Sequence, residues 1–352
     1  MKPDLIKKVS KYIDTWRLLE QGDRVLVGVS GGSDSVALAV LLHQLAPKYR
    51  LKLYWVHVNH QIRPESGEDA DFVQSLAARL GVSLSVEKIA PLFAARSQKR
   101  SLEETARELR FKVFEKVAEE VGICRIALAH HQNDQAETVL MRIIRGSGTQ
   151  GIGAMAPLTL WRGKMIIRPL LECAKKELRD WLIKRDVPWR EDSSNQNKEY
   201  LRNRIRNHLI PLLEESYNKK IQERLATLAA CVQEDQAYIE SSSKDIYQQL
   251  AIRSEGRIHI PLNRLLLLPK AIQRQITRLA INEIQENLKK IDFRHWKEVE
   301  DLYYFRPGRS EVHLPRGIVV QKIKEKIVFY RGEIYARGSK ERQKTKTATF
   351  TA

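Results

Sequence analysis

The chain has 352 residues, 43% of them hydrophobic, so it is long enough for two or three domains. Its formal net charge of +18 favours a polyanionic partner, either nucleic acid or an anionic membrane surface. Its three cysteines, Cys124, Cys173 and Cys231, form no CxxC pair, which argues against a disulfide framework and a structural zinc or iron–sulfur site. The cysteine pattern fits a reducing cytoplasm, and we expect a cytoplasmic protein. No apolar stretch reaches membrane-spanning length and no signal-peptide core is present, and we expect no membrane partner.

Strand and helix patterns alternate through the first part of the chain. A first helix is predicted at 4–20. Strands are predicted at 24–29, 51–59, 84–89, 125–130 and 165–171. Helices are predicted at 36–45, 67–80, 101–121, 172–185 and 200–208, with another ending near residue 145. This alternation predicts an α/β fold with a doubly wound parallel sheet, in which ligands bind beyond the carboxyl ends of the strands.

The loop between the first strand and its helix is the richest stretch in polar chemistry. It reads Ser30, Gly31, Gly32, Ser33, Asp34 and Ser35. Two glycines let the backbone approach a ligand closely, and the start of the following helix attracts an anion. A carboxylate beside a phosphate is repulsive unless a cation lies between them, so Asp34 indicates Mg²⁺. The alternative is an ordinary Gly-Gly turn with a helix-capping residue.

Polar clusters also follow the second and fourth predicted strands. HVNH occupies residues 57–60, and HHQNDQAET occupies residues 130–138. Asp134 and Glu137 are three residues apart, so they share one face of a first helical turn. Adjacent histidines point apart, which argues against a metal site at 130–131.

The second half of the chain changes character. A glycine-rich loop at 146–153 is either a lid or a plain connector, and arginines alternate with asparagines in the predicted helix at 200–208. Helical patterns then dominate. We expect an N-terminal catalytic domain at 1–216, a mostly helical C-terminal domain at 217–330, and a basic, disordered tail at 331–352.

The motifs resemble those of tRNA(Ile)-lysidine synthases, members of the PP-loop ATP pyrophosphatase superfamily with an adenine nucleotide alpha hydrolase-like fold. They are SGGSDS at 30–35, HVNHQIRPES at 57–66, AHHQNDQAET at 129–138, RGSGTQGIGAM at 145–155, RPLL at 168–171, and EDSSN with YLRNRIRNHLIP at 191–211. The resemblance implies a ligase that uses ATP to adenylate the wobble cytidine of CAU-anticodon tRNA(Ile) and then joins L-lysine to its C2. The products would be lysidine, AMP and diphosphate, and codon recognition would change from AUG to AUA.

The resemblance also implies roles for single residues on the nucleotide side. The loop at 30–35 would bind the ATP phosphates, with Asp34 holding Mg²⁺. His57, Asn59 and His60 would flank the nucleotide, or else have a structural role at the strand end.

On the acceptor side, Asp134 and Glu137 would recognise or deprotonate lysine, or else merely stabilise the helix start. Arg110 and Arg204 would neutralise phosphate charge or hold the RNA backbone. The C-terminal domain would bind tRNA, and a homodimer is compatible with the sequence. Two alternatives are a PP-loop tRNA thiolase, disfavoured by the lack of CxxC, and a non-catalytic RNA-binding protein.

Overall fold

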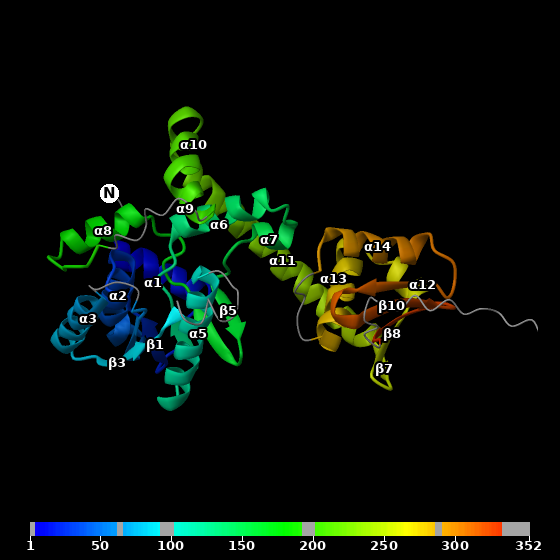
Figure 1. Cartoon of the computed structure of the whole chain (residues 1–352), viewed down its shortest axis with the longest axis horizontal. Helices are drawn as coiled ribbons and strands as arrows, with labels where there is room; N and C mark the ends of the chain where they lie inside the picture. The colour runs from blue at the N-terminus through cyan, green and yellow to red at the C-terminus, as the bar shows by residue number, and fades with distance from the viewer. Residues whose placement is uncertain (1–3, 62–65, 92–101, 192–200, 286–290, 333–352) are drawn as a thin grey trace, which may run out of the picture. The chain divides into compact units, whose positions relative to one another are not determined.

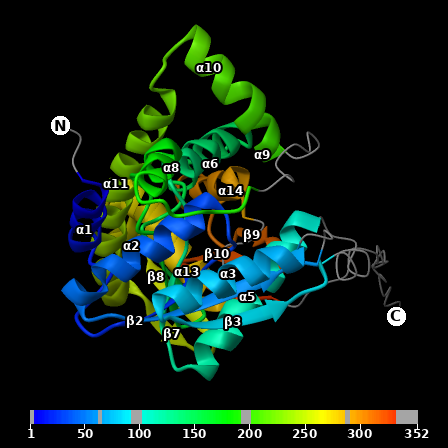
Figure 2. The same ribbon diagram turned by 90° about the vertical axis from the view of Figure 1, so that its left-hand side faces the viewer.

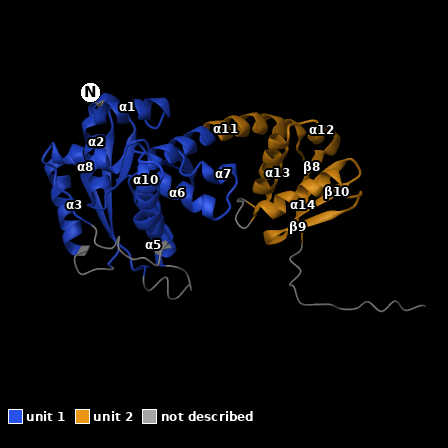
Figure 3. Cartoon of the chain, turned by 90° about the horizontal axis from the view of Figure 1, so that it is seen from above, with its two compact units in different colours: residues 1–233 blue, residues 234–352 orange. Residues whose placement is uncertain are grey.

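The computed structural model describes all residues except 1–3, 62–65, 92–101, 192–200, 286–290 and 333–352. It divides into two compact units, residues 1–233 and 234–352 (Figure 3). The division falls within helix α11 (Ile221–Leu250), whereas the sequence analysis places a domain boundary at 216/217. Apart from residues 331 and 332, the predicted tail lies outside the described residues.

A six-stranded, mostly parallel sheet forms the centre of unit 1 (Figure 1). Its strands are β1 (Arg24–Gly28), β2 (Lys52–Asn59), β3 (Ser83–Lys88), β4 (Arg125–Ala127), β5 (Leu158–Trp161) and β6 (Lys164–Ile167), in the order β3-β2-β1-β4-β6-β5. The sequence predicts the five parallel strands and misses β5, which pairs antiparallel with β6. Their turn is a tight hairpin, because Arg162 and Gly163 both have positive φ.

Helices cover both faces of this sheet. Together with the start of α11, the described α-helices of unit 1 are α1 (Leu5–Thr15), α2 (Ser33–Tyr49), α3 (Ser66–Leu80), α5 (Leu102–Glu120), α6 (Gln132–Ile144), α7 (Thr149–Ile152), α8 (Lys175–Ile183), α9 (Leu201–Arg204) and α10 (Ile210–Ser216). Because side chains alternate along a strand, Val25 and Val27 pack with α1, α2, α3 and α8, while Leu26 packs with α5. None of the helices in the described ranges combines the length and apolarity needed to cross a membrane.

Helix α6 lies between α10 and the sheet in both views (Figures 1 and 2). Its apolar face packs on α11 through a small cluster that includes Val139 and Leu225. The side-chain amide of Gln135 accepts from the Met155 backbone N–H and donates to the Met155 carbonyl, both at 2.9 Å. The side chain of Gln233 in α11 donates to the same carbonyl, also at 2.9 Å. The glycine-rich loop at 146–153 includes α7, and Ile152 of α7 packs against the same cluster. This packing favours a connector over a lid.

Unit 2 contains an antiparallel sheet, so its description as mostly helical is incomplete. The sheet comprises β7 (Ile252–Ser254), β8 (Arg257–Pro261), β9 (Glu311–Leu314), β10 (Ile318–Ile323) and β11 (Lys326–Arg331), in the order β7-β8-β11-β10-β9. Helices α12 (Leu262–Leu266), α13 (Lys270–Gln285) and α14 (Phe293–Tyr304) accompany it. The strands are short, and β8 pairs with the distant β11, so local patterns at 252–261 do not reveal the sheet.

Candidate active site

The loop after β1 has the geometry of an anion cradle. Gly31 has a φ of +93°, which a glycine adopts without strain, and Gly32 is the N-cap of α2. The hydroxyl of Ser35 accepts from the Ser30 backbone N–H at 3.1 Å and donates to the Gly32 carbonyl at 3.0 Å. The loop is therefore held closed by its own hydroxyl groups, and the positive end of α2 faces the same region.

Asp34 begins a chain of charged groups that leads from this loop to α6. Its Oδ2 lies 3.3 Å from His131 Nε2 and 3.8 Å from Lys175 Nζ. The same His131 nitrogen lies 3.5 Å from Asp134 Oδ2, so one buried imidazole contacts both aspartates. Burial raises the pKa of Asp34, but the His131 hydrogen bond and the charges of His131 and Lys175 outweigh it and lower the pKa.

The start of α6 also holds a buried carboxylate pair, Asp134 and Glu137. Counted over the whole residue, they are 8% and 2% exposed. Both carboxylates contact Arg202 and Arg206, which lie at the junction of α9 and a π-helical turn, Ile205–Leu209. Burial opposes the charge of Asp134, but neighbouring cations, His131 first, lower its pKa to about 2. Arg204, the residue chosen from sequence, is exposed on the same helix.

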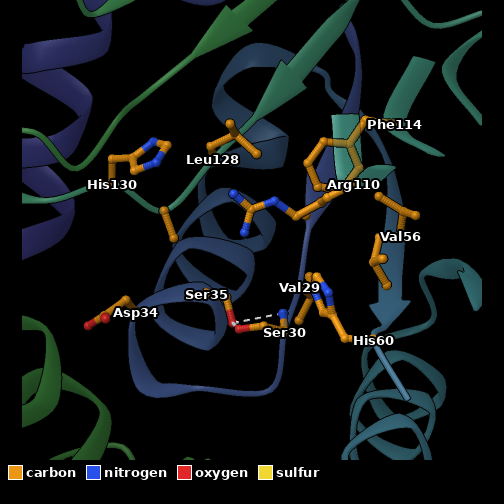
Figure 4. Close-up of a pocket in the computed structure, with 13 residues that line it drawn as sticks. Val29, Ser30, Asp34, Ser35, Val56, His60, Arg110, Phe114, Leu128 and His130 are labelled. Carbon is orange, nitrogen blue, oxygen red and sulfur yellow. Dashed lines mark hydrogen bonds between the residues drawn. The ribbon is translucent and has the colours of Figure 1, made fainter. Parts of the chain in front are cut away.

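A cavity of about 230 Å³ lies beside the loop (Figure 4). Ser30, Asp34, His60, Arg110 and His130 are among the residues that line it. Within the described part of the chain, Arg110 Nε and His130 Nδ1 are buried without a hydrogen-bond partner. Burial is the largest influence on Arg110 and lowers its pKa to about 10, so the guanidinium stays charged at neutral pH. An anion in the cavity would satisfy it.

The three candidates at the end of β2 have different positions. The ring of His57 is buried and its Nδ1 lies 2.9 Å from the Val29 carbonyl oxygen, beneath the loop. Burial lowers the His57 pKa, and the hydrogen bond to Val29 opposes this. Asn59 is also buried and accepts from the Gln61 backbone N–H. Only His60 of these three lines the cavity.

The residues present fit Mg²⁺ held mainly by substrate. Across the described ranges, no three His, Cys, Asp or Glu side chains are arranged to hold a metal ion. Mg²⁺ commonly uses one or two carboxylates together with phosphate oxygens and water. Asp34 supplies one such carboxylate at the edge of the phosphate loop. An all-protein metal site does not fit these residues.

The sequence analysis missed His131, Lys175, Arg202 and Arg206. The spacing of the arginines carried a usable signal, because residues four apart share a helix face, as do Asp134 and Glu137 three apart. No sequence pattern pointed to Lys175, because its position depends on a tertiary contact. Its backbone N–H donates to the side chain of Asn133 in α6.

Comparisons with known proteins show which family the chain is similar to. The PP-loop domain family matches residues 1–213. The tRNA(Ile)-lysidine synthase of Clostridioides difficile is 31% identical over 94% of this chain and 71% of its own. The corresponding enzyme of Solibacter usitatus is 36% identical over 87% of this chain and 67% of its own.

Among solved structures, the U34-tRNA thiolase of Methanococcus maripaludis matches with a TM-score of 0.52 at 17% identity, covering 64% of this chain and 78% of its own. That likeness concerns the fold alone. The sequence matches are more specific, because they extend through both units at above 30% identity. The chain belongs to the tRNA(Ile)-lysidine synthase family of PP-loop proteins.

Proposed function

We propose that the chain joins L-lysine to C2 of the wobble cytidine of CAU-anticodon tRNA(Ile), using ATP and forming lysidine, AMP and diphosphate. The observation that carries this proposal is the single imidazole of His131 between the phosphate-loop aspartate and the buried carboxylate pair. It joins a site suited to ATP to a site suited to an ammonium group.

The first step activates the base. The C2 oxygen of cytidine attacks the α-phosphorus of ATP, an O–P bond forms, and diphosphate leaves. Loop residues 30–35 bind the phosphates, and Arg110 neutralises charge that grows in the cavity. Asp34 would hold Mg²⁺, which would supply further positive charge to the phosphates. In this step a poor leaving group on C2 becomes a good one, AMP.

The second step forms the carbon–nitrogen bond. The lysine ε-amine attacks C2, AMP departs with the former C2 oxygen, and the nitrogen loses a proton. An ordinary lysine has a pKa of about 10.4, so the ammonium form must be bound and then deprotonated. Asp134 and Glu137, which are both buried, bind that ammonium, and we assign the acceptance of its proton to this carboxylate pair.

RNA recognition completes the proposal. The target base is reached only when it leaves the stack and enters a pocket, as single-stranded loops allow. The net charge of +18 supplies affinity for the RNA backbone. We assign part of this contact to unit 2, as expected for the C-terminal region.

The test is incorporation of labelled lysine into tRNA transcripts. With ATP, the full chain should label the CAU-anticodon isoleucine transcript and leave the CAU-anticodon methionine transcript unlabelled. Asp34→Ala serves as the inactive control. Tight binding without label would favour a non-catalytic RNA-binding protein, and sulfur incorporation instead of lysine would favour a thiolase.

A further inference from the structure

The carboxylate pair that should receive lysine is already neutralised by the chain itself. Arg202 donates from Nε to Glu137 at 2.8 Å and from Nη2 to Asp134 at 2.6 Å. Arg206 donates from Nε to Glu137 at 2.5 Å and from Nη2 to Asp134 and Glu137 at 3.3 and 2.9 Å. Two negative charges therefore face two positive charges.

All four carboxylate oxygens are engaged. Asp134 Oδ1 and both oxygens of Glu137 accept from the guanidinium groups. Asp134 Oδ2 accepts from the His131 backbone N–H at 3.1 Å. A lysine ammonium needs two or three of these acceptors, so it has to displace a guanidinium. Adding it without displacement would leave a surplus positive charge in a buried place, which is costly.

The guanidinium groups are better placed to move than the carboxylates. The side chains of Arg202 and Arg206 are 25% and 29% exposed, against 11% and 2% for Asp134 and Glu137. The arginines also sit where a four-residue α-helix passes into a π-helical turn, and such turns are frequent at functional sites. A displaced guanidinium needs another anion, and phosphate suits its fork of N–H donors.

We propose that Arg202 and Arg206 form an arginine latch, which keeps the lysine site closed until a phosphate draws one guanidinium away from the carboxylate pair. The inference rests on the proposed function. It predicts an order of binding in which a phosphate-bearing substrate precedes lysine. The phosphate comes from either ATP or the RNA backbone, and both offer the same chemistry to an arginine.

The experiment measures L-lysine binding to the full chain by calorimetry, without other ligands, with the tRNA transcript, and with α,β-methylene-ATP. For the unaltered protein, whichever ligand supplies the phosphate should tighten lysine binding about tenfold. Arg206→Gln should bind lysine about tenfold more tightly than the unaltered protein with no phosphate ligand present. The matched control, Arg224→Gln, changes an exposed arginine of α11 and should leave lysine binding unchanged.

Arg206→Lys keeps the charge and serves if the glutamine variant does not fold. Its single ammonium satisfies fewer acceptors, so lysine binding should tighten about threefold. Lysine affinity that is unchanged or weaker in the folded variants would overturn the latch, as would an unaltered protein that binds lysine equally with and without either phosphate ligand. If the unaltered protein forms lysidine but gives these results, the latch is wrong and the proposed function stands. If the unaltered protein forms no lysidine, the proposed function itself is wrong.

Discussion

The stability of unit 1 should depend on His130 at mildly acidic pH. Burial is the largest influence on this residue and lowers its pKa from 6.5 to about 3. Asp134 of α6 opposes the shift, and the guanidinium groups of Arg168, Arg110 and Arg202 reinforce it. These arginines come from three different parts of the chain, so the shift belongs to the folded state and disappears on unfolding.

The sign and size of the effect follow from the two pKa values. A histidine whose pKa is lower in the folded chain stabilises the fold above its unfolded pKa, and this stabilisation is lost as the pH falls. Below pH 6.5 the unfolded chain takes up a proton at His130, while the folded chain does so only near pH 3. Between pH 7 and pH 5 the difference amounts to about 2 kcal/mol.

The assay is urea unfolding, followed by tryptophan fluorescence, of the unaltered protein and His130→Gln at pH 7 and pH 5. The unaltered protein should lose about 2 kcal/mol more of its unfolding free energy over this interval than the variant does. All other titrating groups, His131 included, are common to both proteins and cancel in the comparison. Equal losses would refute the claim that His130 is held neutral by its surroundings.

Four further outcomes are expected. Asp34→Ala should abolish tRNA-dependent ATP–diphosphate exchange with little change in melting temperature, and full exchange would contradict the role of Asp34. The pKa of Asp134 is lowered from 3.8 to about 2, so the ionised carboxylate stabilises the fold above pH 3.8 and this stabilisation is lost as the pH falls. In acid unfolding, the unaltered protein should lose about 2 kcal/mol of its unfolding free energy through this group between pH 4 and pH 2, and Asp134→Asn should not show this loss. Thr277→Val removes a 2.7 Å hydrogen bond to the buried Tyr303 hydroxyl and should cost unit 2 about 1–3 kcal/mol in urea unfolding, whereas an unchanged midpoint would show that the bond contributes nothing. Affinity for tRNA in filter binding should fall steeply between 50 and 200 mM salt, and a flat response would argue against contacts to the RNA backbone.

The phosphate loop was predictable because its signals are local. A buried strand, two glycines and a helix start follow one another within a few residues, and the structure has a positive φ at Gly31 and a helix from Ser33. The alternation of strands and helices fixed the parallel part of the sheet for the same reason. The edge strand β5 has only four residues and two exposed positions, so it offered little periodicity.

The acceptor side was harder because it depends on contacts between distant segments. Sequence analysis identified Asp134 and Glu137 as a pair, but it gave the pair no arginine partners, and its assignment of Arg204 to phosphate or the RNA backbone stays a prediction. The structure turns Arg202 and Arg206 toward the pair, since the face that a short helix presents is decided by what it packs against. The spacing of Arg202 and Arg206 places them on one helix face, but no local pattern tells what that face packs against.

Helix α11 has a consequence for how this enzyme can be dissected. A fragment that stops at residue 216, the end of the N-terminal domain predicted from sequence, would lack the helical turns that cover Val139 of α6. It would also lack Gln222, which accepts from Asn133 at 2.5 Å, and Gln233 with its bond to Met155. The turn that carries the carboxylate pair is therefore supported by residues beyond the motifs, so an expression fragment of unit 1 should extend at least to Gln233.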